Sequence, residues 1–140
     1  MSARIFVDTN VLVYAYDIDA GDKQAVAKSI LRDLWDAGSG SLSMQVLQEF
    51  YSTVTRKLAT PLPKDKARLI VDHFARWCIP TTPEEIKQAF RIEDEAKIGF
   101  WDALIVAAAI KSGAKRILSE DLNHGQTIAG IQIVNPFAIQ

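Results

Sequence analysis

The sequence predicts an α/β domain in which a parallel sheet lies between two layers of helices. Short apolar segments that have the pattern of buried strands alternate with longer segments whose apolar residues recur at helical spacing. This alternation is typical of parallel sheets, because neighbouring parallel strands need a crossover that is usually a helix. A length of 140 residues is that of one domain. We therefore expect a single α/β/α sandwich over residues 1–140.

Short apolar segments with β-branched residues are the predicted strands. Residues 5–7 form the first, residues 117–118 and 131–134 form two more near the end of the chain, and residues 41–43 are a brief further candidate. Residues 8–10, Asp-Thr-Asn, are typical of a turn and should end the first strand.

Longer segments with apolar residues at helical spacing are the predicted helices. They cover residues 22–35, 46–58, 64–77, 83–97 and 102–110. Thr82 followed by Pro83 is a typical helix start, with a capping hydroxyl before a proline. Residues 103–110 are apolar all round, which predicts a central buried helix.

The charge balance excludes a protein that attracts polyanions over its whole surface. Sixteen basic and 17 acidic residues give a net charge of −1. A nucleic-acid partner would therefore need a local basic patch. With 49% hydrophobic residues the chain is also too apolar to be intrinsically disordered.

The cysteine content and the length of the apolar segments indicate the cellular compartment of the protein. The lone Cys78 excludes an internal disulfide, which fits a reducing compartment. Charge-free apolar runs fall far short of the roughly 20 residues that span a bilayer, and the N-terminus lacks the pattern of a signal peptide. We expect a cytoplasmic protein without a membrane partner.

Four separated acids stand out because of where they fall in this arrangement. Asp8 and Asp121 follow predicted strands, Asp102 opens the buried helix, and Glu49 lies on the polar side of the 46–58 helix. Each has an ordinary explanation by itself: a turn or loop residue for Asp8 and Asp121, a solvated helix residue for Glu49, and a helix cap for Asp102. In combination they suggest a site, because the carboxyl ends of parallel strands meet at one edge of the sheet.

Four segments of the chain resemble the motifs of the PIN-domain family, in the family's order. They are Phe6–Leu12, Gln45–Tyr51, Phe100–Ile105 and Leu118–Gly125. The sequence is most similar to VapC-type toxins, the small ribonucleases of prokaryotic toxin–antitoxin pairs, over nearly its whole length. This resemblance implies a PIN-like nuclease domain whose catalytic and metal-binding acids are Asp8, Glu49, Asp102 and Asp121.

The resemblance also implies a cofactor, a substrate and partners. The cofactor would be Mg²⁺ or Mn²⁺, hard ions that prefer carboxylate and water oxygens. The substrate would be RNA, and the partners would be a cognate antitoxin protein and a second copy of the chain in a homodimer. Residues that orient the metal ligands would be Thr9, Asn10, Ser119 and Glu120, with Asp121 rather than Glu120 as the ligand.

Basic residues should flank an acidic site that binds a polyanion. Arg56 and Lys57, at the end of the Glu49 helix, are the candidates for holding the RNA backbone. A solvated helix face explains both residues equally well.

Three other functions stay open at this point. A PIN-like interaction module without catalysis would hold a structural ion or none. A nuclease acting on DNA would use the same metal chemistry. A phosphoryl-accepting receiver domain would need paired acids after the first strand and a lysine after the last, and neither occurs in that setting.

Overall fold

The computed structural model describes residues 3–138 and contains one five-stranded sheet in the order β2-β1-β3-β5-β4. The strands are β1 (Ile5–Val7), β2 (Gly40–Ser41), β3 (Arg116–Leu118), β4 (Thr127–Ile128) and β5 (Ile131–Val134). Strands β2, β1, β3 and β5 pair in parallel, and only β4 runs antiparallel to its neighbour β5. The predicted α/β class is confirmed.

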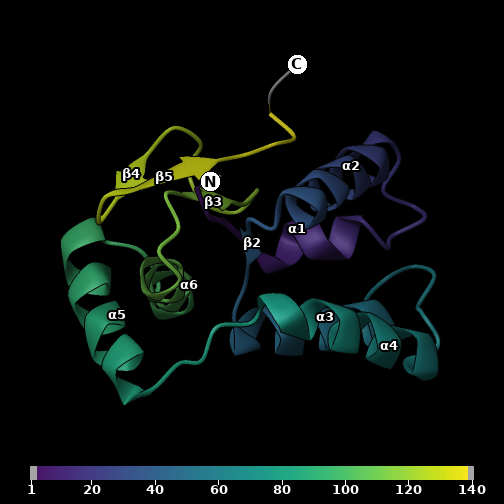
Figure 1. Ribbon diagram of the computed structural model, residues 1–140, viewed down its shortest axis with the longest axis horizontal. Helices are drawn as coiled ribbons and strands as arrows, with labels where there is room; N and C mark the ends of the chain where they lie inside the picture. The colour runs from purple at the N-terminus through teal and green to yellow at the C-terminus, as the bar shows by residue number, and fades with distance from the viewer. Residues whose placement is uncertain (1–2, 139–140) are drawn as a thin grey trace.

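Helices flank this sheet and form pairs in space. They are α1 (Thr9–Tyr14), α2 (Asp22–Ala37), α3 (Met44–Arg56), α4 (Lys64–Phe74), α5 (Pro83–Ala96) and α6 (Phe100–Lys111), with a 3₁₀ turn at Ala75–Trp77. Figure 1 shows α1 with α2, α3 with α4, and α5 with α6 as neighbours. The chain steps from β1 to β2 and later back across β1 to β3, so right-handed crossovers put α1 and α2 on one face of the sheet and α6 on the other.

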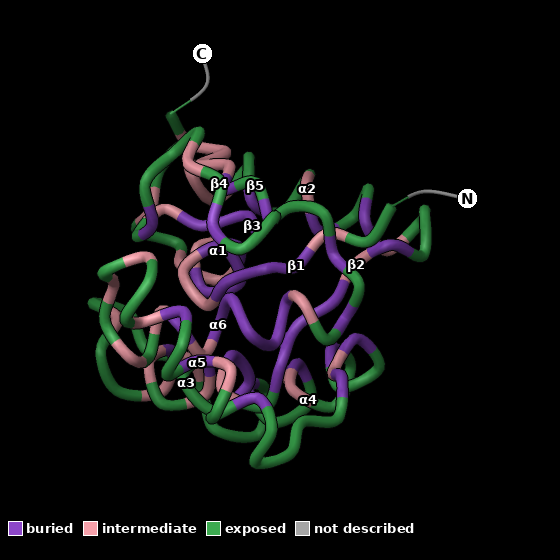
Figure 2. Tube along the Cα trace, turned by 90° about the vertical axis from the view of Figure 1, so that its left-hand side faces the viewer, coloured by how far each residue is buried: buried purple, intermediate pink, exposed green. Residues whose placement is uncertain are grey.

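The centre of the molecule is formed by the strands and by α6. Phe6, Ile117 and Ile133, on three neighbouring parallel strands, are fully buried. Helix α6 buries residues around most of its circumference, including Ala103 and Ala107, as its uniformly apolar sequence predicted. Figure 2 shows the trace of β1 buried and the outer turns of the helices exposed.

The turn predicted at residues 8–10 is instead the start of helix α1. Asp8 is its N-cap and accepts a hydrogen bond from the backbone N–H of Thr9. Helix α1 has only six residues, too few for apolar periodicity to reveal it. The structural difference matters for the site, because it fixes the Asp8 carboxylate at a helix N-terminus.

Two predicted boundaries shift. The short strand is residues 40–41 rather than 41–43, because Leu42 makes only a single bridge to Cys78 and Ser43 caps α3. The helix predicted over residues 64–77 is α-helical only to Phe74 and then tightens into the 3₁₀ turn.

Strand β4 was not predicted from the sequence. It pairs with β5 through a two-residue turn in which Ala129 and Gly130 have φ angles of 49° and 85°. Hairpin turns with positive φ at both positions usually carry Asn-Gly. Because Ala129 stands where Asn is usual, the sequence lacks the pattern that would have predicted this hairpin. Among residues 3–138, no helix combines the length and the apolar character needed to cross a membrane.

Candidate functional site

The fold brings the four predicted acids together at the carboxyl edge of the sheet. Strands β1 and β3 are parallel neighbours, so Asp8 after β1 and Asp121 after β3 emerge at the same edge. Helix α3 packs against α1 and carries Glu49, and the first turn of α6 carries Asp102. Asp8 is close enough to Asp121 and Glu49 for repulsion to raise its pKa, and Asp102 is affected by the same two residues.

Asp8 is the buried member of the set, with 5% of its surface exposed. Its Oδ1 accepts from the backbone N–H of Thr9 at 2.7 Å, and its Oδ2 accepts from the Ser119 hydroxyl at 2.7 Å. The pKa of Asp8 is raised to about 6, chiefly by burial. The two hydrogen bonds act to lower this pKa, and the charges of Asp121 and Glu49 act to raise it. A bound cation would remove much of this cost.

Both carboxylate oxygens of Glu49 accept hydrogen bonds. The Thr9 hydroxyl donates to Oε1 at 2.7 Å. The Gln45 amide donates to Oε2 at 3.4 Å and to the carbonyl oxygen of Trp101 at 3.3 Å. Gln45 therefore links α3 to the turn that carries Asp102, a role that its position one helical turn before Glu49 only hints at.

Asn10 lies between two of the acids. Its amide nitrogen donates to Oδ2 of Asp121 at 3.2 Å and lies 3.4 Å from Oδ2 of Asp8. Its oxygen accepts from the backbone N–H of Glu120 at 3.0 Å, and the Ser119 hydroxyl accepts from that of Asp121 at 3.1 Å. Thr9, Asn10 and Ser119 thus each contact two of the four acids, as expected of the ligand-orienting residues that the motif resemblance implies.

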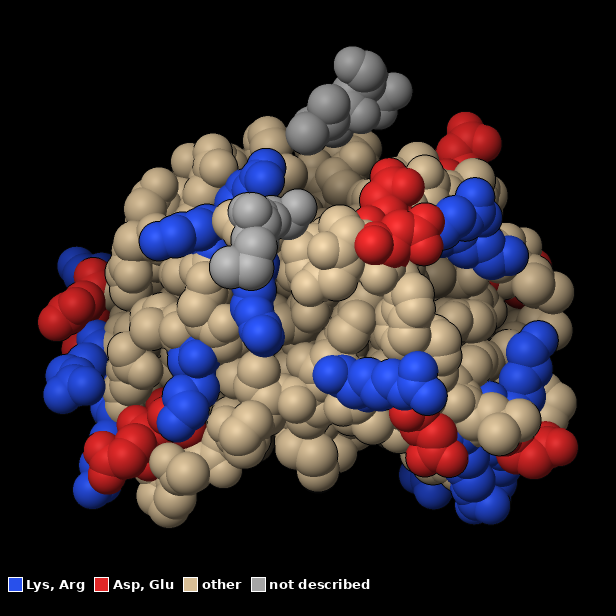
Figure 3. Space-filling model, viewed as in Figure 1, with Lys and Arg blue, Asp and Glu red and all other residues tan. Residues whose placement is uncertain are grey.

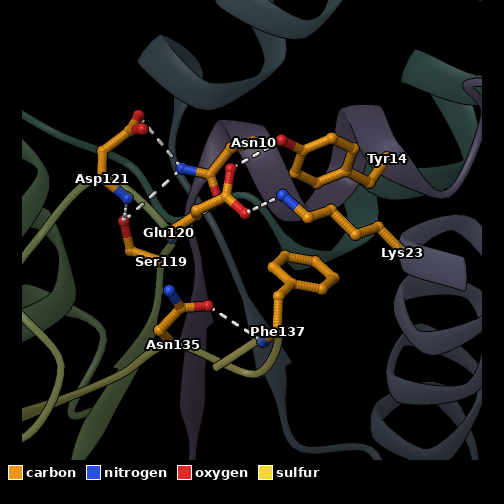
Figure 4. A network of polar contacts seen from close by, with 8 residues as sticks. All are labelled: Asn10, Tyr14, Lys23, Ser119, Glu120, Asp121, Asn135 and Phe137. Atoms are coloured by element: carbon orange, nitrogen blue, oxygen red, sulfur yellow. Dashed lines mark hydrogen bonds and ion pairs between the residues drawn. The ribbon is translucent and has the colours of Figure 1, made fainter. Parts of the chain in front are cut away.

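Glu120 points in a different direction from Asp121. Its carboxylate accepts from the Tyr14 hydroxyl at 2.6 Å and forms an ion pair with Lys23 at 2.5 Å (Figure 4). The neighbouring Asp121 is exposed and interacts with Asp8 and Asp102. Of the two adjacent acids, Asp121 is the one that faces the other carboxylates.

Asp102 makes none of the contacts that a helix cap would make. The N-cap of α6 is Gly99, and no side chain caps this end of the helix. Within residues 3–138, no group donates a hydrogen bond to the Asp102 carboxylate. Partial burial raises the pKa of Asp102, and repulsion from Asp121 and Glu49 adds to the rise. The capping explanation therefore does not account for this acid.

The donor set fits a hard divalent cation in its chemistry. Two ion pairs occur within residues 3–138, Lys23 with Glu120 and Lys87 with Glu84, and neither involves the four acids. The described residues contain no three His, Cys, Asp or Glu side chains placed closely enough to hold one ion as they stand. The hydrogen bonds from Thr9, Asn10 and Ser119 hold Asp8, Glu49 and Asp121 in these positions, so binding of one ion by three carboxylates would require side-chain rotation.

A cleft of about 600 Å³ opens beside these acids. Its lining includes Glu49 and Asp121 together with Lys57 and Leu58. Arg56, the neighbour of Lys57, is exposed but is not part of this lining. On the face shown in Figure 3, basic side chains lie in separate groups among neutral and acidic ones, in keeping with the net charge.

The sequence matches the family model of the PIN domain over residues 5–127. The chain belongs to the PIN domain family. This span contains all four acids and both basic candidates at the end of α3. No curated protein matches the chain by sequence.

Solved structures resemble this PIN domain over most of its length. A toxin–antitoxin complex from Klebsiella pneumoniae superposes with a TM-score of 0.69 at 19% identity, covering 96% of this chain and 98% of its own. VapBC2 from Rickettsia felis, bound to a DNA fragment from its promoter, gives 0.64 at 20% identity, with 92% and 96% covered. VapC20 from Mycobacterium tuberculosis, a toxin that cleaves the sarcin–ricin loop, gives 0.62 at 19% identity, with 84% and 89% covered.

These comparisons confirm the resemblance drawn from the four motifs. At such low identities the solved structures show a shared fold. The toxins of toxin–antitoxin pairs are therefore the structural relatives of this PIN domain.

Proposed function

We propose that this PIN domain is a divalent-metal-dependent endoribonuclease that hydrolyses phosphodiester bonds of RNA, and that it is the toxin of a type II toxin–antitoxin pair. The observation that carries the proposal is the convergence of four carboxylates from four separate segments, with no ion-pair partner for them among the described residues. A buried acid such as Asp8 is costly without a compensating charge.

Asp8, Glu49, Asp102 and Asp121 would hold Mg²⁺ or Mn²⁺. Such an ion, when bound, supplies a lowered pKa for an attacking water and stabilises negative charge on the phosphate and the leaving oxygen. No histidine lies among the four acids or the residues that contact them, so we assign no side chain as general base.

The surrounding residues orient the carboxylates and bind the substrate. Thr9 and Ser119 each direct a carboxylate through a 2.7 Å hydrogen bond, and Asn10 spaces Asp8 from Asp121. Lys57, which lines the same cleft as Glu49 and Asp121, would bind a backbone phosphate of the RNA strand that crosses the acids.

RNA is the proposed substrate, and a protein antitoxin is the proposed partner. The related VapC20 cleaves the sarcin–ricin loop, which is RNA, and several structural relatives are complexes of toxin with antitoxin. A homodimer belongs to the same proposal, and light scattering of the purified protein tests it. A short reading frame beside the gene, whose product co-purifies with the chain, tests the antitoxin.

The test of the activity is cleavage of an end-labelled single-stranded RNA. The purified protein should cleave with Mg²⁺ or Mn²⁺ and stop with EDTA, and Asp8→Asn and Asp102→Asn should each lose cleavage by at least about 100-fold while remaining folded. Asp94→Asn, an exposed acid on α5, is the matched control and should cleave normally. Single-stranded DNA of the same sequence distinguishes a deoxyribonuclease.

Cleavage that survives EDTA, or that both site variants retain, would refute the mechanism. A non-catalytic PIN module is the second candidate, because the described side chains do not form a ready three-ligand group. That alternative predicts no cleavage with any of the metals, together with unchanged binding of the antitoxin by the Asp8→Asn and Asp102→Asn variants.

A further inference from the structure

We propose that Glu120 is a positioning residue, anchored by Lys23 and Tyr14, that directs the adjacent Asp121 into the site. The inference rests on the proposed function in one respect, that Asp121 is taken as a metal ligand. It assigns to α2 and to the C-terminal segment a role in the site that the four motifs do not include.

Both oxygens of Glu120 are bound by side chains of α1 and α2 (Figure 4). Oε1 accepts from the Tyr14 hydroxyl of α1 at 2.6 Å, and Oε2 meets the Lys23 ammonium of α2 at 2.5 Å. Its backbone N–H donates to Asn10 at 3.0 Å. Although partial burial raises the pKa of Glu120, these partners and the charge of Lys23 hold it below its ordinary value, so the anchor is ionised at neutral pH.

Aromatic rings cover this ion pair. The Lys23 nitrogen lies 5.0 Å from the centre of the Tyr14 ring and 5.7 Å from that of Phe137, and the two rings meet edge to face at 5.0 Å. The Asn135 side chain accepts from the backbone N–H of Phe137 at 2.9 Å and so shapes the segment after β5.

The cover makes this ion pair different from an ordinary surface pair. The side chains of Lys23 and Glu120 are 44% and 25% exposed, whereas those of the other pair, Lys87 and Glu84, are 67% and 73% exposed. Solvent and salt screen an exposed pair strongly and leave it little stabilising effect, while a partly covered pair is screened less.

Asp121 has few contacts of its own to fix its direction. It is exposed, its side chain meets Asn10 at 3.2 Å, and its backbone N–H reaches Ser119. The adjacent Glu120 carries the same functional group, so a turn free to twist could present either acid to the other carboxylates. Anchoring Glu120 to Tyr14 and Lys23 leaves Asp121 facing them, which is the arrangement observed.

The experiment compares Lys23→Met, Tyr14→Phe and Glu120→Gln with the wild type in two measurements. Calorimetry with Mn²⁺ alone should show binding about 10–100-fold weaker in Lys23→Met and Glu120→Gln, the loss typical when a residue that orients a ligand is removed. In the metal-free protein, the Asp121 and Leu122 amides, which bond to Ser119, should exchange hydrogen faster. Tyr14→Phe, which keeps the ion pair, should show a smaller loss.

Matched variants separate positioning from a general effect on stability. Lys23→Arg should restore Mn²⁺ affinity to within a few-fold of the wild type, and Lys87→Met should change neither measurement. The double variant Lys23→Met with Glu120→Gln should bind Mn²⁺ no more weakly than the worse single variant, because both changes break one interaction.

Unchanged Mn²⁺ affinity together with unchanged amide exchange in Glu120→Gln would overturn the inference, as would equal losses in Lys87→Met. A wild type that binds no Mn²⁺ refutes the metal site of the proposed function. In that case the exchange of the Asp121 amide still decides whether Glu120 anchors the turn.

Discussion

The hydroxyl of Ser119 donates a 2.7 Å hydrogen bond to Oδ2 of Asp8, a residue 111 positions earlier in the chain. Ser119 is fully buried and follows β3. Its hydroxyl oxygen also accepts from the backbone N–H groups of Asp121 and Leu122, in the turn that comes next in the chain. One hydroxyl therefore joins the carboxylate after β1 to the turn that carries Asp121. The site is held together across two neighbouring strands.

Ser119→Ala should raise the pKa of Asp8 above about 6, because the hydrogen bond that lowers it is lost. It should also reduce the free energy of unfolding by about 1–3 kcal/mol, since buried polar groups lose a partner. Carbon-13 NMR of the Asp8 carboxyl group in the metal-free protein measures the first effect, and urea unfolding measures the second.

Ser112→Ala is the control for this variant. Ser112 is also buried, donates to the Ala109 carbonyl at 2.7 Å and accepts from the Ser41 hydroxyl, and neither hydrogen bond involves one of the four acids. The Ser112→Ala variant should have a lower free energy of unfolding than the wild type, with the Asp8 pKa unchanged. An Asp8 pKa that moves equally in both variants would contradict the direct role of Ser119.

Asp8→Asn should stabilise the metal-free protein at pH 8. The folded protein binds a proton at Asp8 with a pKa of about 6, against 3.8 for the ordinary group. Stability from this residue is therefore greatest below pH 3.8 and is lost as the pH rises through about 6, a difference of roughly 3 kcal/mol. Asparagine keeps the capping oxygen and carries no charge to desolvate.

Thermal unfolding of both proteins in EDTA, from pH 4 to pH 8, measures this difference. The advantage of Asp8→Asn should shrink toward pH 4, where Asp8 in the wild type is protonated. Saturating Mn²⁺ should stabilise the wild type more than the variant. An advantage that does not depend on pH would contradict the raised pKa.

Lys57→Ala should weaken binding of single-stranded RNA, and Arg56→Ala should have a smaller effect. Both side chains are exposed and adjacent in sequence, but only Lys57 lines the cleft that contains Glu49 and Asp121. Losing one phosphate contact should make the slope of log affinity against log salt shallower by about 0.7. Fluorescence anisotropy in the Asp102→Asn background measures both quantities without cleavage.

Equal salt slopes for the two variants would show that the cleft does not hold the RNA backbone. The same result would favour a strand path over another part of the surface. That result would not bear on the prediction that the four carboxylates bind metal.

Ala129→Gly should increase the free energy of unfolding by about 0.5–1 kcal/mol, because Ala129 has a φ of 49° in the hairpin turn between β4 and β5. Ala25→Gly, at an exposed position within α2, should lower it by about 1 kcal/mol. Urea unfolding compares the two. Destabilisation by both substitutions would contradict the assigned turn geometry.

The fold class could be predicted from local patterns, whereas the set of four acids came from their combination and from the motif resemblance. The uniformly apolar stretch after Asp102 predicts a buried helix, and Asp8 and Asp121 follow strands that are parallel neighbours in the structure. The four motifs resemble those of the PIN family in the family's order, and the match to the family model confirmed the family.

The parts that could not be predicted depend on short elements or on tertiary contacts. Helix α1 has six residues, too few for periodicity, so Asp8 was expected in a turn rather than at a helix N-terminus. The contacts of Gln45 with Trp101 and of Glu120 with Lys23 join residues 56 and 97 positions apart, and no local pattern reveals such pairs.

We expect the four carboxylates to bind divalent metal at one shared site. Anomalous diffraction from crystals grown with Mn²⁺ tests it most directly. A manganese peak should lie within about 2.0–2.3 Å of oxygens of Asp8 and of at least two others among Glu49, Asp102 and Asp121. Fully ordered carboxylates with no peak between them, at Mn²⁺ concentrations that support RNA cleavage, would contradict it.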